Sequence, residues 1–189
     1  MDRCSRLWLG KTLMKSIRLV KPTMAYKDQI EAYRQAFLDS GESLSGTSGL
    51  RDYEHAEDWI KHVMLGEQKL YLPKDKVPAT QYLCITEDNI IIGMINIRHE
   101  LNDYLMKYGG HIGYSVHPDY RKQGYAKAQL GLALDECQQF DLKNVLITCN
   151  QSNLASSKTI LAHGGVLENE IPEEGTNEII RRYWITIKE

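Results

Sequence analysis

The stretch Val116-His-Pro-Asp-Tyr-Arg-Lys-Gln-Gly-Tyr-Ala126 leads directly from a β-rich run into a run with helical spacing. Gly124 opens the helix without a side chain and Ala126 is small, so several backbone amides can converge on one point. The helix N-terminus adds about half a positive charge, and such an arrangement suits a pyrophosphate. Arg121 and Lys122 can add charge at the rim. The segment therefore predicts an anion-binding strand-to-helix turn.

The motif is more specific than a plain turn that contains a glycine. It reads Arg-x-x-Gly-x-Ala after a strand that ends Val-x-Pro, and it contains neither Gly-Lys-Ser/Thr nor GxGxxG. It resembles the acyl-CoA-binding motif Gln/Arg-x-x-Gly-x-Gly/Ala of the GNAT superfamily of N-acetyltransferases, with Arg121, Gly124 and Ala126 at the defined positions. Three further stretches resemble a bacterial subgroup of predicted acetyltransferases: Ile97-Arg-His-Glu-Leu-Asn, Gly109-Gly-His-Ile-Gly-Tyr and Arg181-Arg-Tyr-Trp-Ile.

The order of the expected elements agrees with this resemblance from about Ile17 to Ile187. Apolar runs predict strands at 17–20, 81–86, 90–98, 111–116, 145–149 and 179–187. Helical spacing predicts helices over 23–37, 56–65, 124–139 and 153–162. Hairpin strands pair antiparallel and strands joined through a helix usually run parallel, so we expect an α/β (α+β) fold with helices on both faces of a mixed sheet. The resemblance implies that the sheet is mostly antiparallel, with a central splayed parallel strand pair.

The resemblance also implies where acetyl-CoA binds. Backbone groups of Tyr114, Ser115 and Val116 would pair with the pantetheine arm, and the amides from Lys122 to Ala126 would hold the pyrophosphate. Asn153-Leu-Ala-Ser resembles the Asn-x-x-Ala start of the next family helix, so Asn153, with Ser156 or Ser157, would contact the arm. Asn153 could equally cap that helix. The cofactor-binding residues expected on this basis are Tyr114, Ser115, Val116, Arg121, Lys122, Gln123, Gly124, Tyr125, Ala126, Asn153 and Ser156.

The positions that usually handle protons in the family are empty. Where many members carry a glutamate six residues before Val116, this chain has Gly110, and the usual tyrosine seven residues after Asn153 is Ile160. Glu100 and His111 are therefore the catalytic candidates, because a carboxylate or a histidine can accept the proton of the amine. His99 is a further base, and Tyr108 and Tyr183 are alternative proton donors. Each of these residues has a purely structural interpretation as well, at a strand edge, in a loop or in packing.

The sequence leaves the acceptor amine open. Glu100 and Asp103 would favour a cationic amine, whereas Arg98 would favour an acceptor that carries a carboxylate. The Gly-rich and Ser-rich segment 41–49 predicts a loop, which is either a linker between helices or a loop over the substrate.

Composition restricts the class of protein. The 189 residues suit one domain, and a net charge of −2 gives no sign of a nucleic-acid partner. None of the cysteines forms a CxxC pair, so no metal site is expected. Cys84 and Cys149 are expected as small buried residues rather than catalytic thiols. No run approaches the roughly 18 apolar residues of a membrane span.

The N-terminal segment does not fit a signal peptide, because Lys11 interrupts its short apolar patch. We expect residues 1–13 to lie outside the fold and residues 14–189 to form a single domain. The sequence thus predicts a cytoplasmic N-acetyltransferase, monomeric or homodimeric, that transfers acetyl from acetyl-CoA to a primary amine of a small molecule or peptide by direct attack. Two alternatives are a non-catalytic acyl-CoA-binding sensor and a nucleotide-binding protein. The absence of a Lys-Ser/Thr pair for magnesium argues against the latter.

Overall fold

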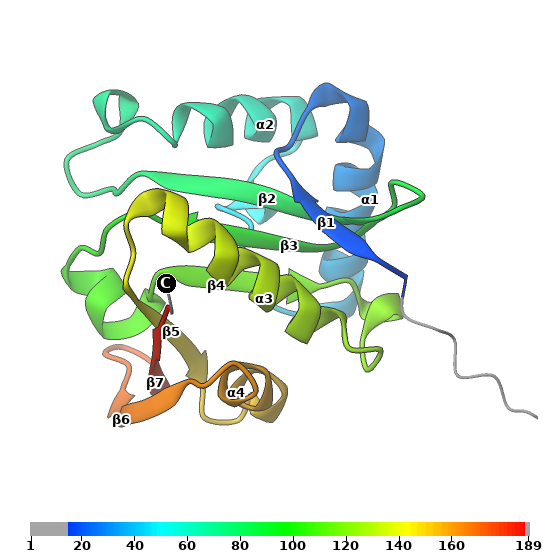
Figure 1. Ribbon diagram of the computed structural model, residues 1–189. Coiled ribbons are helices and arrows are strands. Elements are labelled where there is room, and N and C mark those ends of the chain that lie inside the picture. The colour runs from blue at the N-terminus through cyan, green and yellow to red at the C-terminus, as the bar shows by residue number, and fades with distance from the viewer. Residues whose placement is uncertain (1–14, 188–189) are drawn as a thin grey trace, which may run out of the picture.

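The computed structural model describes residues 15–187 and contains two sheets (Figure 1). The first sheet has the strand order β1-β2-β3-β4, formed by Ile17–Val20, Ala79–Thr86, Ile91–Arg98 and Ile112–Val116. All three neighbouring pairs are antiparallel. The expected hairpin is present as β2 and β3, and its turn contains Asn89 with a positive φ of 59°.

Helices cover both faces of this sheet. Helices α1, Lys27–Ser40, and α2, Ala56–Leu65, pack on one face, where the apolar stripe Ile30, Tyr33 and Phe37 is buried as its spacing predicts. Helix α3, Tyr125–Cys137, lies across the other face (Figure 1). Short helical turns lie at 24–26, 50–52, 69–71, 118–120 and 138–140, and a π-helical turn lies at Leu105–Gly109.

The second sheet has the order β5-β7-β6, formed by Asn144–Asn150, Ile179–Thr186 and Val166–Pro172. Helix α4, Leu154–Leu161, packs beside β5 and α3. Strand β6 was not predicted. All its residues except Ile171 are exposed, so hydrophobic alternation gave no signal, and only its pairing with β7 defines it.

One hydrophobic core joins the two sheets. Ile97 and Ile112 of the first sheet share a cluster with Val145 and Ile185 of the second and with Leu130 of α3. The mixed α/β architecture predicted from the sequence is confirmed. The expected central parallel pair is β4 and β5. These two strands are not joined by a continuous ladder of backbone hydrogen bonds, because they belong to different sheets.

The separation between β4 and β5 begins at His111. Its backbone N–H donates to the Leu146 carbonyl at 2.7 Å, and its Nδ1 accepts from the Leu146 N–H at 2.9 Å. Beyond this point the two strands diverge, and the C-terminal parts of both line the same cavity, through Gly113 and Tyr114 on β4 and Thr148 on β5. The strands thus run side by side in one direction and open into a cleft.

The cysteines are buried, as expected. Cys84, Cys137 and Cys149 are buried free thiols, and burial raises the pKa of Cys84 and of Cys137 to about 12. Across residues 15–187, no helix is long and apolar enough to cross a membrane, and no cluster of potential metal ligands occurs. The N-terminal extension 1–13 and Cys4 lie outside the described residues.

Candidate acyl-CoA site and acceptor cavity

The strand-to-helix turn has the conformation that an anion site requires. A 3₁₀ turn, Pro118–Tyr120, follows β4, and the chain then passes through Lys122 with φ 60° and Gly124 with φ 93°. Glycine tolerates this left-handed conformation. The first helical hydrogen bond of α3 runs from the Ala128 N–H to the Gly124 carbonyl at 3.1 Å. The backbone N–H groups of α3 that come before Ala128 therefore have no carbonyl acceptor within the helix, and they are available to an anion.

These amides open into a cavity of about 620 Å³, which we call the cofactor cavity. Its wall includes every predicted cofactor residue except Gln123: Tyr114, Ser115, Val116, Arg121, Lys122, Gly124, Tyr125, Ala126, Asn153 and Ser156. The Gln123 side chain instead donates to the Asp119 carbonyl at 3.0 Å. Asn153 caps α4, because its side-chain oxygen accepts from the Ser156 N–H at 3.1 Å, and it also lines the cavity. The two interpretations of Asn153 are thus compatible.

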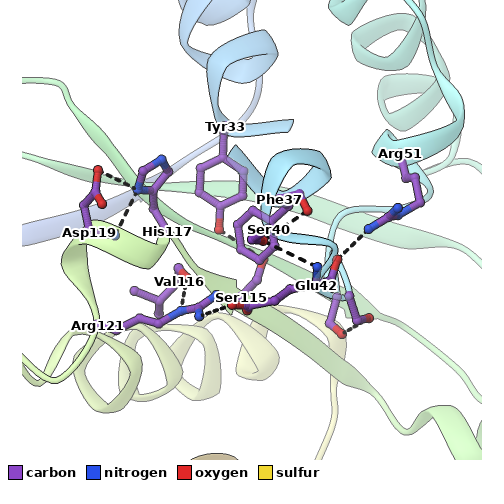
Figure 2. A network of polar contacts seen from close by, with 12 residues as sticks. Tyr33, Phe37, Ser40, Glu42, Arg51, Ser115, Val116, His117, Asp119 and Arg121 are labelled. Atoms are coloured by element: carbon purple, nitrogen blue, oxygen red, sulfur yellow. Dashed lines mark hydrogen bonds and ion pairs between the residues drawn. The ribbon is translucent and has the colours of Figure 1, made fainter. Parts of the chain in front are cut away.

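Arg121 connects the turn to the loop 41–49, as Figure 2 shows. Its guanidinium pairs with the Glu42 carboxylate at 2.7 Å, donates to the Val116 carbonyl at 3.1 Å and lies over the Phe37 ring. The hydrogen bond from Arg121 holds the pKa of Glu42 below its usual range. Sequence reasoning missed Glu42, because the loop is distant in sequence and carries no motif.

Beside it, Tyr33 anchors β4 to α1. The buried Tyr33 hydroxyl donates to Ser115 Oγ at 3.1 Å (Figure 2), and burial raises the pKa of Tyr33. Ser115 also accepts, through its carbonyl, a hydrogen bond from the buried Gln129 side chain at 3.3 Å. Two helices on opposite faces therefore fix the strand end that lines the cofactor cavity.

A second cavity of about 490 Å³, the acceptor cavity, adjoins the first. Tyr114, Asn153, Ser156, Ser43 and Ser45 line both cavities. The loop 41–49 thus covers both sites and is not merely a linker. Its Gly46 packs so closely on β4 that an added Cβ would lie 2.3 Å from the Gly113 carbonyl oxygen.

Neither of the two catalytic candidates lines the cofactor cavity or the acceptor cavity. Glu100 lies in the turn after β3, and its carboxylate pairs with Lys69 at 2.6 Å. The Nδ1 lone pair of His111 is engaged by the Leu146 N–H, and burial lowers the pKa of His111 to about 4. This geometry argues against either residue as the base, because neither side chain faces the two adjoining cavities.

The other residues considered for proton transfer, His99, Tyr108 and Tyr183, lie in three different places. The His99 ring hydrogen-bonds to Thr80 Oγ1 and stacks on Phe140. Tyr183 is buried and donates to Ser157 Oγ at 3.2 Å, whereas Tyr108 lines the acceptor cavity.

Tyr114 is the tyrosine at the junction of the cavities, and sequence reasoning gave it only a backbone role. Its hydroxyl lies 3.0 Å from Ser156 Oγ, and burial raises the pKa of Tyr114. The alternating strand pattern alone could not have assigned it to the cleft, since a tyrosine on a strand usually packs in the core.

Comparisons with known proteins agree with this architecture. The sequence model of the acetyltransferase (GNAT) domain matches residues 20–166. No curated protein sequence matches the chain significantly.

Several solved structures share the fold at low sequence identity. RimL, the ribosomal L7/L12 alpha-N-protein acetyltransferase in complex with coenzyme A, superposes with a TM-score of 0.65 at 20% identity, over 93% of this chain and 96% of that one. Mycobacterium smegmatis RimJ in complex with CoA-disulfide gives 0.66 at 16% identity, over 90% and 81%. Mutant forms of the spermidine/spermine N-acetyltransferase SpeG from Vibrio cholerae give 0.62 at 14% identity, over 90% and 93%. At these identities the likeness concerns the fold.

Proposed function

The chain belongs to the GNAT acetyltransferase family, whose enzymes use acetyl-CoA, and we propose that it transfers the acetyl group to a primary amine by direct attack on the thioester. The observation that carries this proposal is the junction of two cavities at Tyr114, one walled by the anion-binding turn and the other open to an acceptor. A binding-only protein would need the first cavity but not the second.

The residues present fit the cofactor. The amides of the first turn of α3 have no helical acceptor, so they can donate to a pyrophosphate, and Lys122 adds positive charge at the wall. Bound acetyl-CoA supplies an activated acyl group. Among the described residues no strand pairs with β4 on its cleft side from Tyr114 onward. The Ser115 and Val116 carbonyls are already bonded to Gln129 and Arg121, so the remaining backbone groups of this stretch are available to the pantetheine arm and to the thioester carbonyl.

Proton transfer would rely on solvent and on Tyr114. No carboxylate or imidazole lines the acceptor cavity within the described chain, so the ammonium group of the acceptor must lose its proton to water before attack. Tyr114 is a stronger acid than the serines that also line both cavities. We therefore assign to it the donation of a proton to the departing thiolate.

Turnover of a panel of primary amines tests this function. Release of free thiol from acetyl-CoA, with acetylated product seen by mass spectrometry, is the expected result. Tyr114→Phe should lower kcat at least tenfold, in the range expected for loss of general acid catalysis, while the Kd of CoA stays nearly constant. Binding of CoA without thiol release for any amine would favour the alternative, a non-catalytic acyl-CoA sensor.

A further inference from the structure

Arg98 is a largely buried cation without a carboxylate partner. It ends β3, and its Nη1 donates to the carbonyls of Gly109 at 2.9 Å and Gly110 at 3.0 Å. Among residues 15–187 no acidic side chain forms an ion pair with it, and burial lowers the pKa of Arg98. Buried charges in proteins are usually paired, so this arginine has an unmet preference for an anion.

The free part of the guanidinium faces the acceptor cavity. Arg98 lines that cavity, and its Nε and Nη2 make no hydrogen bond with the described chain. Gly113 gives room to both the loop and the guanidinium, since a Cβ there would lie 3.2 Å from Gly46 Cα and 3.4 Å from Nη2. The two carbonyls that hold Nη1 fix the direction of the remaining donors, which is the condition for recognising a planar anion.

The charged group on the wall of the acceptor cavity disfavours the binding of a cationic acceptor. Arg98 is the only charged residue on the described wall, and the other polar groups are hydroxyls and amides. Glu100 and Asp103 do not line it. Two carboxylates adjoin wall residues without lining the cavity. Glu42, next to Ser43 in sequence, pairs with Arg121 at 2.7 Å, and the exposed Glu178 accepts from the Asn150 amide at 3.1 Å. On the described wall itself a polyamine would thus meet a like charge and no carboxylate.

We propose that Arg98 binds a carboxylate of the acceptor, so that the substrate is an amino acid or a short peptide with a carboxylate close to its amine. The cavity of about 490 Å³ suits a small molecule of this class. This inference rests on the proposed acetyl transfer, since it assigns the substrate class of the same site.

The test compares amino acids with their carboxamides, which keep the amine and the side chain but lack the charge. Rates are compared per fraction of neutral amine, because the two series differ in the pKa of the amine. For the native protein we expect kcat/KM to favour the acids by about 10- to 100-fold, the usual worth of a hydrogen-bonded charge. Arg98→Met should remove this preference, Arg98→Lys should restore part of it, and the Kd of CoA should remain unchanged.

A second pair of variants leaves the hydrogen bonds of Arg98 intact. Ser152 is exposed and lines only the acceptor cavity. Ser152→Asp should therefore lower kcat/KM for the acids by at least tenfold more than Ser152→Asn, since Asn has the size of Asp without its charge. Equal turnover of acids and carboxamides, or a preference for spermidine or phosphoethanolamine, would overturn the inference and leave acetyl transfer standing.

Failure of the proposed function is distinguishable from failure of this inference. If no amine is turned over, the CoA-bound protein is titrated with N-acetyl amino acids and N-acetyl amino acid amides by calorimetry. Preferential binding of the acids, lost in Arg98→Met, would support the carboxylate site without catalysis. Equal or absent binding of both would contradict it.

Discussion

At the scale of single residues, His111 shows how a side chain can replace strand pairing. Its backbone makes the last hydrogen bond between β4 and β5 and its ring makes the next one, both to Leu146. From the sequence alone, a histidine just before the strand that leads into the anion-binding turn suggests a general base for acetyl transfer. The tertiary contact instead makes it the point from which the cleft opens.

We expect His111 to make stability depend on pH. Its pKa is lowered to about 4 in the folded protein, against about 6.5 when unfolded. The unfolded state therefore takes up the proton first as the pH falls below about 6.5, and stability declines by about 2 kcal/mol between pH 7 and pH 5. His111→Asn keeps an acceptor for Leu146 but does not titrate. Urea unfolding at both pH values should show this decline diminished in the variant, and an equal decline in both proteins would refute the assignment.

The pH dependence of acetyl transfer is also set by single ionisable groups. Because no base lines the acceptor cavity, kcat/KM should rise with pH until the acceptor amine is neutral. The profile should follow the pKa of the amine when amines of different pKa are compared. Glu100→Gln and His111→Asn should leave the profile in place, whereas loss of its ascending limb in either variant would identify that residue as the base.

At the scale of elements, the loop 41–49 shapes both cavities although nothing in its composition distinguishes it from a linker. Glu42 reaches Arg121, and Gly46 packs on β4. Glycine-rich composition predicted the loop itself. Its position could not be predicted, because the contacts that fix it lie some seventy residues away in the sequence and carry no local pattern.

Gly46→Ala tests the importance of this loop. Gly46 has φ 70°, and its new Cβ would overlap the Gly113 carbonyl at 2.3 Å, so the loop must move. An overpacking cost of about 1–3 kcal/mol should appear as a KM raised about tenfold for both acetyl-CoA and the acceptor. Gly41→Ala is the matched control, because its φ is 67° but no atom lies within 4 Å of the added Cβ. Similar kinetics for the two variants would mean that the loop does not shape the sites.

At the scale of the whole molecule, the cleft exists because two sheets share a core but not a continuous ladder. The first sheet supplies β4 and the second supplies β5, while α3 and α4 each contribute the start of a helix to the cofactor cavity. A ligand in the cleft therefore contacts both halves of the fold.

Binding of CoA should accordingly stabilise the entire domain. At about 100 times its Kd, CoA should add about 2.7 kcal/mol, which is a rise in Tm of about 5–10 °C for a chain of this length. Lys127→Glu is a useful comparison, because Lys127 is exposed and lines the cofactor cavity in the first turn of α3. An acidic residue there is favourable for the helix, yet it repels the pyrophosphate. This variant should keep the Tm of the free protein and lose the shift. A full shift in the variant would place the anion elsewhere.

The sequence by itself determined the types of the elements other than β6, the anion-binding turn and the family resemblance, because each depends on residues adjacent in the chain. Gly124 and Ala126 carry their conformational meaning locally, as does the stripe from Ile30 to Phe37. Only the tertiary structure decided which charged side chains face the cleft. It placed Glu100 beside Lys69 and left Arg98 alone in the acceptor cavity, since burial and the nearest charges depend on segments that meet only after folding.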